Sequence, residues 1–184
     1  IRGAIALGKY EEAYGMIGNL ARFFQLALSH GDEKIPIADE MEMIEKYLEL
    51  MSIIYPGQFQ WKINVDDAIK PFLIAKFTLQ PLVENAIQHG IRPKGENGTL
   101  TITGSFEDDD ISIYIMDNGI GIDEKRLQGL QNSLSSGEIR QGAGYGIKNV
   151  HSRLQMFYGM RYGLTINRAE IEGIVVKVLI PQDV

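Results

Sequence analysis

Two glycine clusters in this chain have the residue types and spacing that could bind a nucleotide. Residues 117–121, Asp-Asn-Gly-Ile-Gly, follow a segment that the sequence predicts to be a strand. A carboxylate at a strand end can accept a hydrogen bond from a planar base, and glycines at alternate positions let the backbone approach that base closely. Residues 142–146, Gly-Ala-Gly-Tyr-Gly, run into a predicted helix. The free N–H groups at the start of a helix can bind a phosphate.

Neither cluster is specific by itself, because an ordinary glycine turn explains each one equally well. The cluster at 142–146 is not a P-loop, since no Lys-Ser or Lys-Thr pair follows it. It also lacks the G-x-G-x-x-G spacing and the preceding strand of a Rossmann fingerprint. The function of the clusters therefore depends on the rest of the chain.

Glu84 and Asn85 lie inside a predicted helix over residues 79–91, where apolar residues recur at steps of three and four. Asn is unfavourable in a helix interior because its amide competes for backbone hydrogen bonds. Taken alone, the pair is best interpreted as a surface feature of an amphipathic helix that Gly90 ends. The order of the motifs is more informative. A helix with Glu-Asn precedes a strand ending in Asp-x-Gly-x-Gly, and Gly-x-Gly-x-Gly opens a later helix.

The elements that must position these motifs can be predicted from hydrophobic periodicity. Alternating or continuous apolar residues predict strands over five segments, 59–65, 100–104, 111–115, 164–167 and 174–180. A helix is predicted over 145–158, and the acidic run 107–110 is interpreted as a solvated hairpin turn. Residues 118–144 show little apolar periodicity and are predicted to be a long connection. Connections of that length are typical of lids or binding loops.

The first part of the chain is predicted to be helical. Residues 10–29 have a wide apolar face at helical spacing. A second helix is predicted to begin at Asp39, with Glu42 completing a capping box, and to end at Pro56-Gly57. The chain is therefore divided into a helical piece, 1–56, and an α/β domain, 57–184.

Bulk composition excludes several classes of function. The chain has 184 residues, of which 45% are hydrophobic, enough for one domain with an appended helical segment. A net charge of −6 argues against nucleic acid or an anionic membrane surface as the main partner. The chain has no cysteine, so disulfides and thiolate metal sites are excluded. No signal or membrane-spanning pattern is present. Because the first residue is Ile and not Met, we expect a fragment of a longer protein.

In this order, the three motifs resemble the nucleotide-binding domain of the GHKL superfamily, which includes gyrase, Hsp90, histidine kinases and MutL. Within it, the chain resembles sensor histidine kinases of the LytS/YesM type. Residues 79–90 resemble their N box, residues 144–154 resemble their G2 box and the helix beyond, and Tyr47-Leu48-Glu49 resembles the segment before the domain. The resemblance covers residues 57–184 and implies the Bergerat ATP-binding fold. This is an α/β, two-layer (α+β) sandwich in which helices cover one face of a mixed β-sheet, here preceded by a helical segment.

The resemblance also implies roles in binding ATP and Mg²⁺. Asn85 would coordinate Mg²⁺, and Glu84 could polarise a water or the incoming imidazole. Asp117 would accept a hydrogen bond from the adenine amine, with Gly119 and Gly121 shaping the purine pocket. The remaining implied groups are the lid hinge and phosphate cradle at Gly142, Gly144 and Gly146, and the nucleotide-proximal residues His89 and Lys148.

Some of these residues have alternative interpretations. His89 could simply end its helix, and Lys148 could lie on a solvated helix face. Gln88 stands where relatives often carry a basic residue, so Lys148 or Arg153 could replace a phosphate contact. A zinc site at Glu84 and His89 is excluded, because two ligands without a third do not make a site.

The implied activity is transfer of the ATP γ-phosphoryl group to a His on a helix upstream of this chain, for relay to the receiver domain of a response regulator. None of the three histidines present lies in the expected acceptor motif; His30 is interpreted as a helix-end residue and His151 as an exposed helix residue. The full-length protein is expected to be a homodimer in the bacterial plasma membrane, anchored through upstream segments, with this region in the cytoplasm.

Two other functions compete with that one. The chain could be a nucleotide-gated binding module that binds ATP without productive transfer. An ATP-hydrolysing clamp is disfavoured, because Pro81 stands where those enzymes carry a catalytic Glu.

Overall fold

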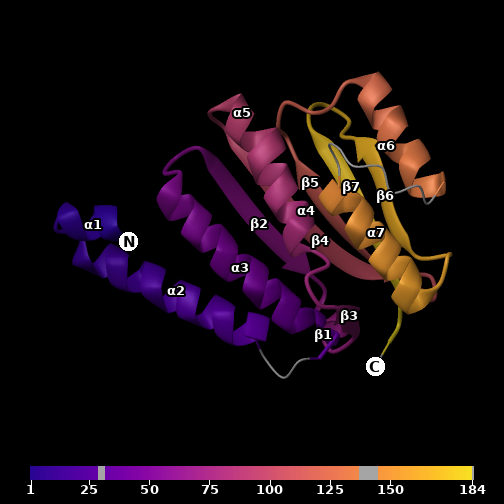
Figure 1. Ribbon diagram of the computed structural model, residues 1–184, viewed down its shortest axis with the longest axis horizontal. Helices are drawn as coiled ribbons and strands as arrows, with labels where there is room; N and C mark the ends of the chain where they lie inside the picture. The colour runs from indigo at the N-terminus through magenta and orange to yellow at the C-terminus, as the bar shows by residue number, and fades with distance from the viewer. Residues whose placement is uncertain (29–31, 137–144, 184) are drawn as a thin grey trace.

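A five-stranded mixed sheet with helices packed on one face forms the body of the molecule (Figure 1). The computed structural model describes residues 1–28, 32–136 and 145–183. The strands are β2 (Phe59–Val65), β4 (Gly98–Glu107), β5 (Asp110–Asp117), β6 (Gly163–Arg168) and β7 (Ile174–Pro181), in the spatial order β2-β4-β5-β7-β6. The β2–β4 pair is parallel and the other pairs are antiparallel. All five lie where the alternation of apolar residues predicted them.

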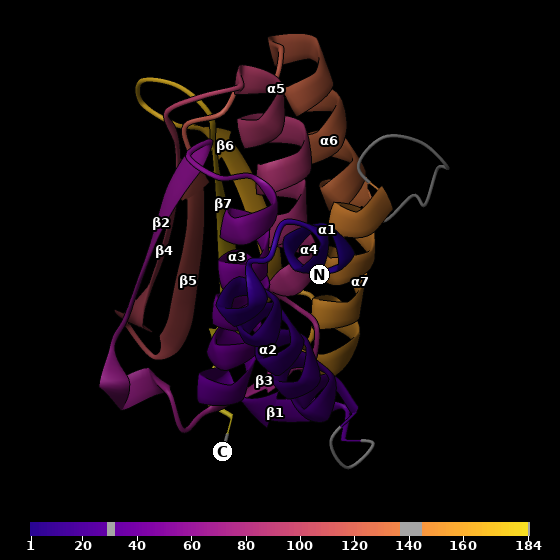
Figure 2. The same cartoon turned by 90° about the vertical axis from the view of Figure 1, so that its left-hand side faces the viewer.

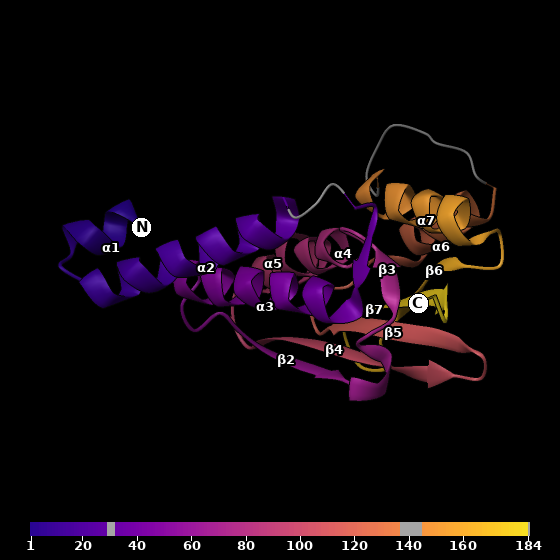
Figure 3. The same cartoon turned by 90° about the horizontal axis from the view of Figure 1, so that it is seen from below.

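The pleat explains why these segments are strands. Ile111, Ile113 and Ile115 of β5 are at most 1% exposed and point to the helical layer, because side chains two apart share one face of a strand. Figures 2 and 3 show the helices gathered on that face. The two-layer architecture is therefore the predicted one.

The predicted helix over 79–91 forms three consecutive helical segments. These are α4 (Gln80–Asn85), a π-helical segment, η2 (Ala86–Ile91), and α5 (Arg92–Lys94). The predicted stop at Gly90 is wrong, because the helical backbone continues until Gly95, whose φ of +91° ends it. π-helical turns inside α-helices occur frequently at functional sites, and this one directly follows Asn85.

Residues 118–144 contain a helix that the sequence analysis missed, α6 (Glu124–Ser136). Asp123 caps its first turn by accepting a hydrogen bond from the Arg126 N–H at 2.9 Å. Leu127 and Leu134 are buried at helical spacing. Gly, Gln and Ser elsewhere in the segment obscured this narrow apolar stripe. The next helix, α7 (Tyr145–Tyr158), has the predicted bounds.

The N-terminal part contains α1 (Arg2–Ala6), α2 (Tyr10–Leu28) and α3 (Ile37–Ile54). The predicted cap at Asp39 is wrong, because α3 begins two residues earlier and its N-cap is Pro36. Asp39 instead lies in the first turn, where a negative charge suits the helix dipole. Before α3, β1 (Lys34–Pro36) pairs antiparallel with β3 (Leu73–Ala75).

Helix α3 lies between α2 and the sheet, as Figure 3 shows. Met43, Ile44 and Leu48 are fully buried, and they belong to the same hydrophobic cluster as Ile102 and Ile113 of the sheet. The division of the chain at residue 56 stays a prediction, but the hydrophobic core continues across it.

The acidic run is only partly a solvated turn. Asp108 and Asp109 form the turn between β4 and β5, as predicted. Asp110 is buried, and its carboxylate accepts hydrogen bonds from the Arg161 guanidinium at 2.6 Å and the Tyr162 hydroxyl at 3.1 Å. Its interpretation as a solvated residue is therefore wrong. In the described part of the chain, no helix is both long and apolar enough to span a membrane.

Candidate functional site

A cavity of about 590 Å³ lies between the sheet and the helices α4, α6 and α7. Its apolar wall includes Ile115, Ile166 and Val176 of the sheet. Five residues that the sequence analysis singled out line it: Asn85, His89, Asp117, Gly121 and Lys148. Residues from widely separated parts of the sequence therefore meet at one site.

Asp117 is the buried charged group of this cavity. It is the last residue of β5 and only 7% exposed, and its carboxylate accepts a hydrogen bond from the Gly119 N–H at 2.8 Å. Burial raises the pKa of Asp117 to about 6, although the Gly119 and Ile174 N–H groups and the Lys94 charge oppose the rise. A buried carboxylate is stabilised by a hydrogen-bond donor, and an exocyclic amine entering the cavity is such a donor.

Three glycines bring the backbone close to Asp117. A Cβ atom on Gly90 would lie 2.7 Å from the Asp117 carboxylate, one on Gly119 would lie 2.2 Å from the Gly90 carbonyl carbon, and one on Gly173 would lie 1.9 Å from the Asp117 carbonyl oxygen. The Ile120 N–H donates to the Gly90 carbonyl at 3.1 Å. A side chain at Gly119 or Gly173 would push backbone segments apart, and one at Gly90 would displace the Asp117 carboxylate.

Gly119 therefore supports the cavity from behind rather than lining it, whereas Gly121, with φ of +68°, does line it. The sequence analysis missed the roles of Gly90 and Gly173. Gly90 was interpreted only as a helix stop, and nothing in the sequence indicates that Gly173, in the β6–β7 connection, meets Asp117.

Asn85 lies at another part of the cavity, at the end of α4. Its side-chain Nδ2 donates to the Pro81 carbonyl at 2.6 Å, one helical turn earlier. Among the described residues, this leaves the amide oxygen as the atom available to a ligand. A Cβ atom on Gly146 would lie 3.6 Å from the same Nδ2, so the start of α7 lies against Asn85. Asn85 of the N box and Gly146 of the G2 box, 61 positions apart in sequence (146 − 85), thus meet here.

Glu84 does not line the cavity. Its carboxylate accepts a hydrogen bond from the Gln80 side-chain amide at 2.8 Å. It also lies close enough to Tyr47 of α3 to help burial raise the pKa of that hydroxyl to about 12. The two members of the polar pair therefore point to different surroundings.

The cavity has cations from two helices. Lys148 of α7 lines it, as does Arg126 of α6, which the sequence analysis missed together with its helix. Arg153 does not line the cavity, because its guanidinium donates to the Phe77 carbonyl at 2.6 Å. It is therefore not positioned as the phosphate contact considered above. Gly142 and Gly144 lie outside the described residues.

His151 is not the exposed residue that the sequence analysis expected. It is buried beneath β6, and its Nδ1 accepts a hydrogen bond from the Leu164 N–H at 2.9 Å. A Cβ atom on Gly163 would lie 2.6 Å from that nitrogen, so glycine makes room for the ring. Burial lowers the pKa of His151. His151 therefore packs inside the structure. The apolar stripe of α7 did not indicate that His151 is buried.

Comparisons with known proteins show the family and the fold that this chain resembles. Residues 75–184 match the profile of the histidine kinase-, DNA gyrase B- and HSP90-like ATPases, and residues 1–59 match a histidine kinase profile. The sensor protein LytS of Oceanobacillus iheyensis is 33% identical over 172 residues, covering 93% of this chain and 29% of that protein. The sensor histidine kinase YesM of Bacillus subtilis is 27% identical, covering 90% of this chain and 27% of that protein.

A solved structure, the catalytic domain of the histidine kinase ThkA, matches with a TM-score of 0.61 at 17% identity, covering 83% of this chain and all of that domain. This likeness confirms the predicted fold class. The chain spans less than a third of the length of the two curated relatives. The resemblance to the LytS/YesM type is confirmed, and because the ATPase profile covers more than half of the sequence, this chain belongs to the histidine kinase-, DNA gyrase B- and HSP90-like ATPase family.

Proposed function

We propose that this chain is the ATP-binding catalytic region of a two-component sensor histidine kinase. It would bind ATP in the cavity and transfer the γ-phosphoryl group to a His on a helix upstream of residue 1. The observation that carries the proposal is the buried carboxylate of Asp117 at one end of a cavity whose other end holds Asn85 and the start of α7. The full-length relatives are named as sensor proteins, which supports the same class of activity.

At the first end of the cavity, Asp117 would accept a hydrogen bond from the adenine amine. The apolar wall would hold the purine ring, and the three close-packed glycines keep the carboxylate fixed. A fixed acceptor in a water-excluded pocket discriminates strongly against a base that lacks the exocyclic amine. With such a base bound, the buried carboxylate of Asp117 would have no hydrogen-bond donor from the base.

At the other end, Asn85 would bind Mg²⁺ through its amide oxygen, a hard ligand that suits this ion. The described residues contain no group of three or more His, Asp or Glu side chains able to hold a metal. One protein ligand suits Mg²⁺ on ATP, since waters and phosphate oxygens fill the other positions. When bound, Mg²⁺ would offset negative charge on the transferring phosphoryl group.

Other residues would act on the phosphates and on the acceptor. Lys148 and Arg126 would attract the phosphates, with His89 nearby and residues 142–146 as the proposed cradle and lid hinge. Glu84 is the carboxylate next to Asn85, and we keep it as the group proposed to polarise the incoming imidazole. For that role its carboxylate must leave Gln80 and turn toward the cavity.

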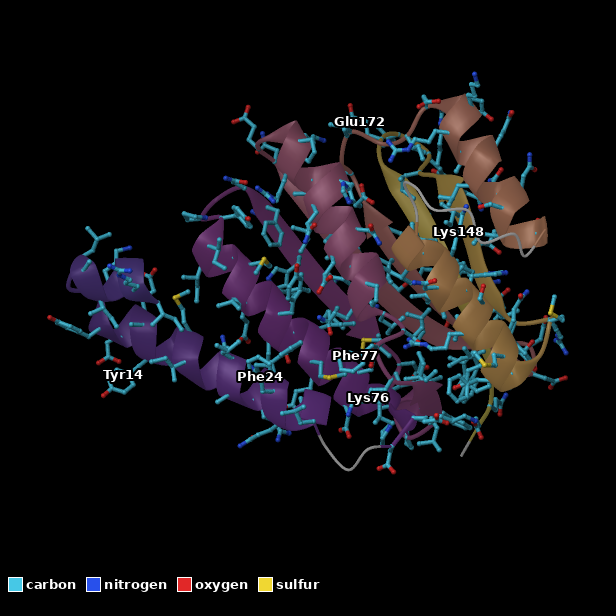
Figure 4. All side chains as sticks on the ribbon, in the orientation of Figure 1. Tyr14, Phe24, Lys76, Phe77, Lys148 and Glu172 are labelled. Atoms are coloured by element: carbon cyan, nitrogen blue, oxygen red, sulfur yellow. The ribbon has the colours of Figure 1, made fainter. Side chains whose placement is uncertain are left out.

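The helical segment has a surface suited to a second copy. Tyr10, Tyr14, Ile17, Phe24 and Leu28 are exposed at steps of three, four and seven along α2. Such spacing forms one stripe on a helix, and helices with this repeat pack together. Figure 4 shows Tyr14 and Phe24 on α2, outside the body of the molecule. We propose that this stripe forms part of a homodimer in the full-length protein, which would lie in the bacterial plasma membrane with this region in the cytoplasm and signal to a receiver domain.

Radiolabelled ATP tests the proposal on a chain extended upstream to include the acceptor helix. We expect Mg²⁺-dependent labelling in an acid-labile linkage. Asp117→Asn serves as the control, because it removes the carboxylate proposed to accept from the adenine amine. ATP binding without any labelling of that helix would favour the competing function, a nucleotide-gated binding module.

A further inference from the structure

Phe77 has an unusual backbone conformation just before α4. Its φ is +59°, in the left-handed region that an aromatic residue rarely occupies. Strained residues of this kind persist only where the surrounding structure fixes them, and they concentrate at functional sites. Figure 4 shows Phe77 between α3 and the start of α4.

Side chains from two other helices hold both polar backbone groups of Phe77. The Phe77 N–H donates to Glu40 of α3 at 3.0 Å, and the Phe77 carbonyl accepts from Arg153 of α7 at 2.6 Å. Glu40 also accepts from the Leu79 N–H at 2.9 Å with its second oxygen. The strained turn is therefore held between α3 and α7.

Glu40 is the central group of this arrangement. It is fully buried, which raises the pKa of its carboxyl, whereas the backbone N–H donors and the positive charge of Arg153 oppose that rise. A charged side chain is rarely buried unless hydrogen bonds satisfy it. Here the donors include the N–H group of Leu79, the N-cap of α4, and that of Phe77, two residues before it. An N–H group at a helix start has no partner within its helix.

The same helix carries Asn85 six residues after Leu79. Helical hydrogen bonds make those residues a stiff unit, so the anchor at its N-terminal end fixes where the Asn85 amide oxygen lies. Glu40 does not line the cavity. It belongs to the segment that matches the histidine kinase profile, residues 1–59, and lies outside the ATPase profile, residues 75–184.

We propose that Glu40 is a positioning residue for the Mg²⁺·ATP site, which it acts on through α4 and Asn85. This inference rests on the proposed function, because it assigns the effect to the metal end of that cavity. It makes the upstream helix α3 part of the scaffold of the nucleotide site. A displacement of α3 relative to the sheet would act first on the start of α4, which carries Asn85, whereas Asp117 belongs to β5 of the sheet.

The test is calorimetric titration of the whole chain with ATP, in Mg²⁺ and in EDTA, and with adenosine. Glu40→Gln keeps the shape of the side chain but replaces one acceptor with a donor facing other donors. We expect the gain in ATP affinity on adding Mg²⁺ to fall about tenfold, the loss typical of changing a group that supports a metal ligand. Adenosine affinity should stay within about twofold of wild type, since Asp117 is unaffected.

Glu42→Gln is the matched control, because it makes the same change on the same helix. Glu42 pairs with Arg22 at 2.6 Å on the surface, so its loss should leave the Mg²⁺-dependent gain unchanged. A different outcome is that Glu40→Gln weakens the binding of ATP with Mg²⁺, of ATP in EDTA and of adenosine by the same factor. That result would overturn the proposal, because Glu40 would then stabilise the whole domain and not the metal end alone. An unchanged gain in the folded variant would overturn it too.

If Glu40→Gln does not fold, Arg153→Lys decides the matter, since an ammonium group cannot reproduce the fork of the guanidinium. The proposal then requires that Arg153→Lys reduce the same Mg²⁺-dependent gain, by less than the roughly tenfold loss expected for Glu40→Gln. An unreduced gain in Arg153→Lys would overturn the proposal. Absence of any Mg²⁺-dependent gain in the wild-type chain would instead contradict the proposed function, so the two failures are distinguishable.

Discussion

The two ends of the cavity are built differently. Around Asp117, three backbone segments meet at Gly90, Gly119 and Gly173, closer than any side chain would allow. Around Asn85, side chains extend from separate helices, and their relative position depends on contacts such as Glu40 and Arg153 with Phe77. The first end is held by backbone packing, whereas the second is held by side chains.

This difference suits the two tasks that we propose. Recognition of a base requires a fixed acceptor, since a misplaced one loses discrimination. Phosphoryl transfer depends on positioning and charge, so a movable metal end is a means of control. The two ends should therefore respond separately to substitution.

The largest effect is expected from Gly119→Ala. A Cβ atom there would lie 2.2 Å from the Gly90 backbone, which cannot yield as a flexible side chain would. We expect a loss of about 3 kcal/mol in the free energy of unfolding, at the upper end for overpacking, measured by urea denaturation. Adenosine binding should be lost with it.

Gly15→Ala in α2 is the matched control, because nothing lies within 4 Å of its Cβ position and it does not line the cavity. It should raise the free energy of unfolding by about 0.5–1 kcal/mol, as alanine does in a helix interior. Equal stability of the two alanine variants would refute the close packing at the Asp117 end.

Asn85→Ala should act on the other end alone. The amide oxygen is the proposed Mg²⁺ ligand, so we expect the Mg²⁺-dependent gain in ATP affinity to fall by about 10–100-fold. Adenosine affinity, measured by the same calorimetry, should be unchanged. A parallel loss of adenosine binding would mean that the two ends are not independent.

Acid should weaken the Asp117 end. The pKa of its carboxyl is raised to about 6, so the ionised acceptor is present above that pH and is lost as pH falls through it. Adenosine affinity should therefore drop about tenfold from pH 7 to pH 5. For stability the sign is opposite, since a raised carboxyl pKa favours the folded state at low pH and this contribution disappears as pH rises through 6. Flat adenosine affinity over this range would contradict the assignment.

The smallest effect is expected from Glu84→Gln. The side chain lies outside the cavity lining and can keep a hydrogen bond with Gln80. ATP affinity should change less than about twofold, and labelling of the upstream His should slow by about tenfold, because positioning and charge dominate this transfer. If Glu84→Gln binds ATP normally but labelling is abolished, Glu84 contributes far more to phosphoryl transfer than its position outside the cavity lining indicates.

Local patterns in the sequence explain most of the fold. Ile111, Ile113 and Ile115 alternate cleanly, which identifies β5 and so places Asp117 at a strand end. The missed helix α6 lacks such a clear apolar pattern, because Gly, Gln and Ser surround its few buried leucines. Periodicity reports which residues face a core, and a narrow stripe in polar surroundings gives a weak signal.

The site was predictable only as far as its motifs are local. Asp117 and Asn85 belong to recognisable segments, and the structure brings both to one cavity. Gly173 and Glu40 gave no such signal, since their importance comes from segments far away in sequence. Glu40 reads as an ordinary acidic residue of a first helical turn, and only the fold shows that it anchors a different helix.

The most direct test of the central claim compares ATP with inosine triphosphate, which carries an oxygen in place of the adenine amine. The wild-type chain should prefer ATP by about 100-fold, because a buried acceptor is left unpaired by the inosine base. Asp117→Asn removes the buried charge, so it should remain folded while losing that preference. Equal wild-type affinity for the two nucleotides, or an Asn variant that still prefers ATP, would contradict the assignment of this cavity.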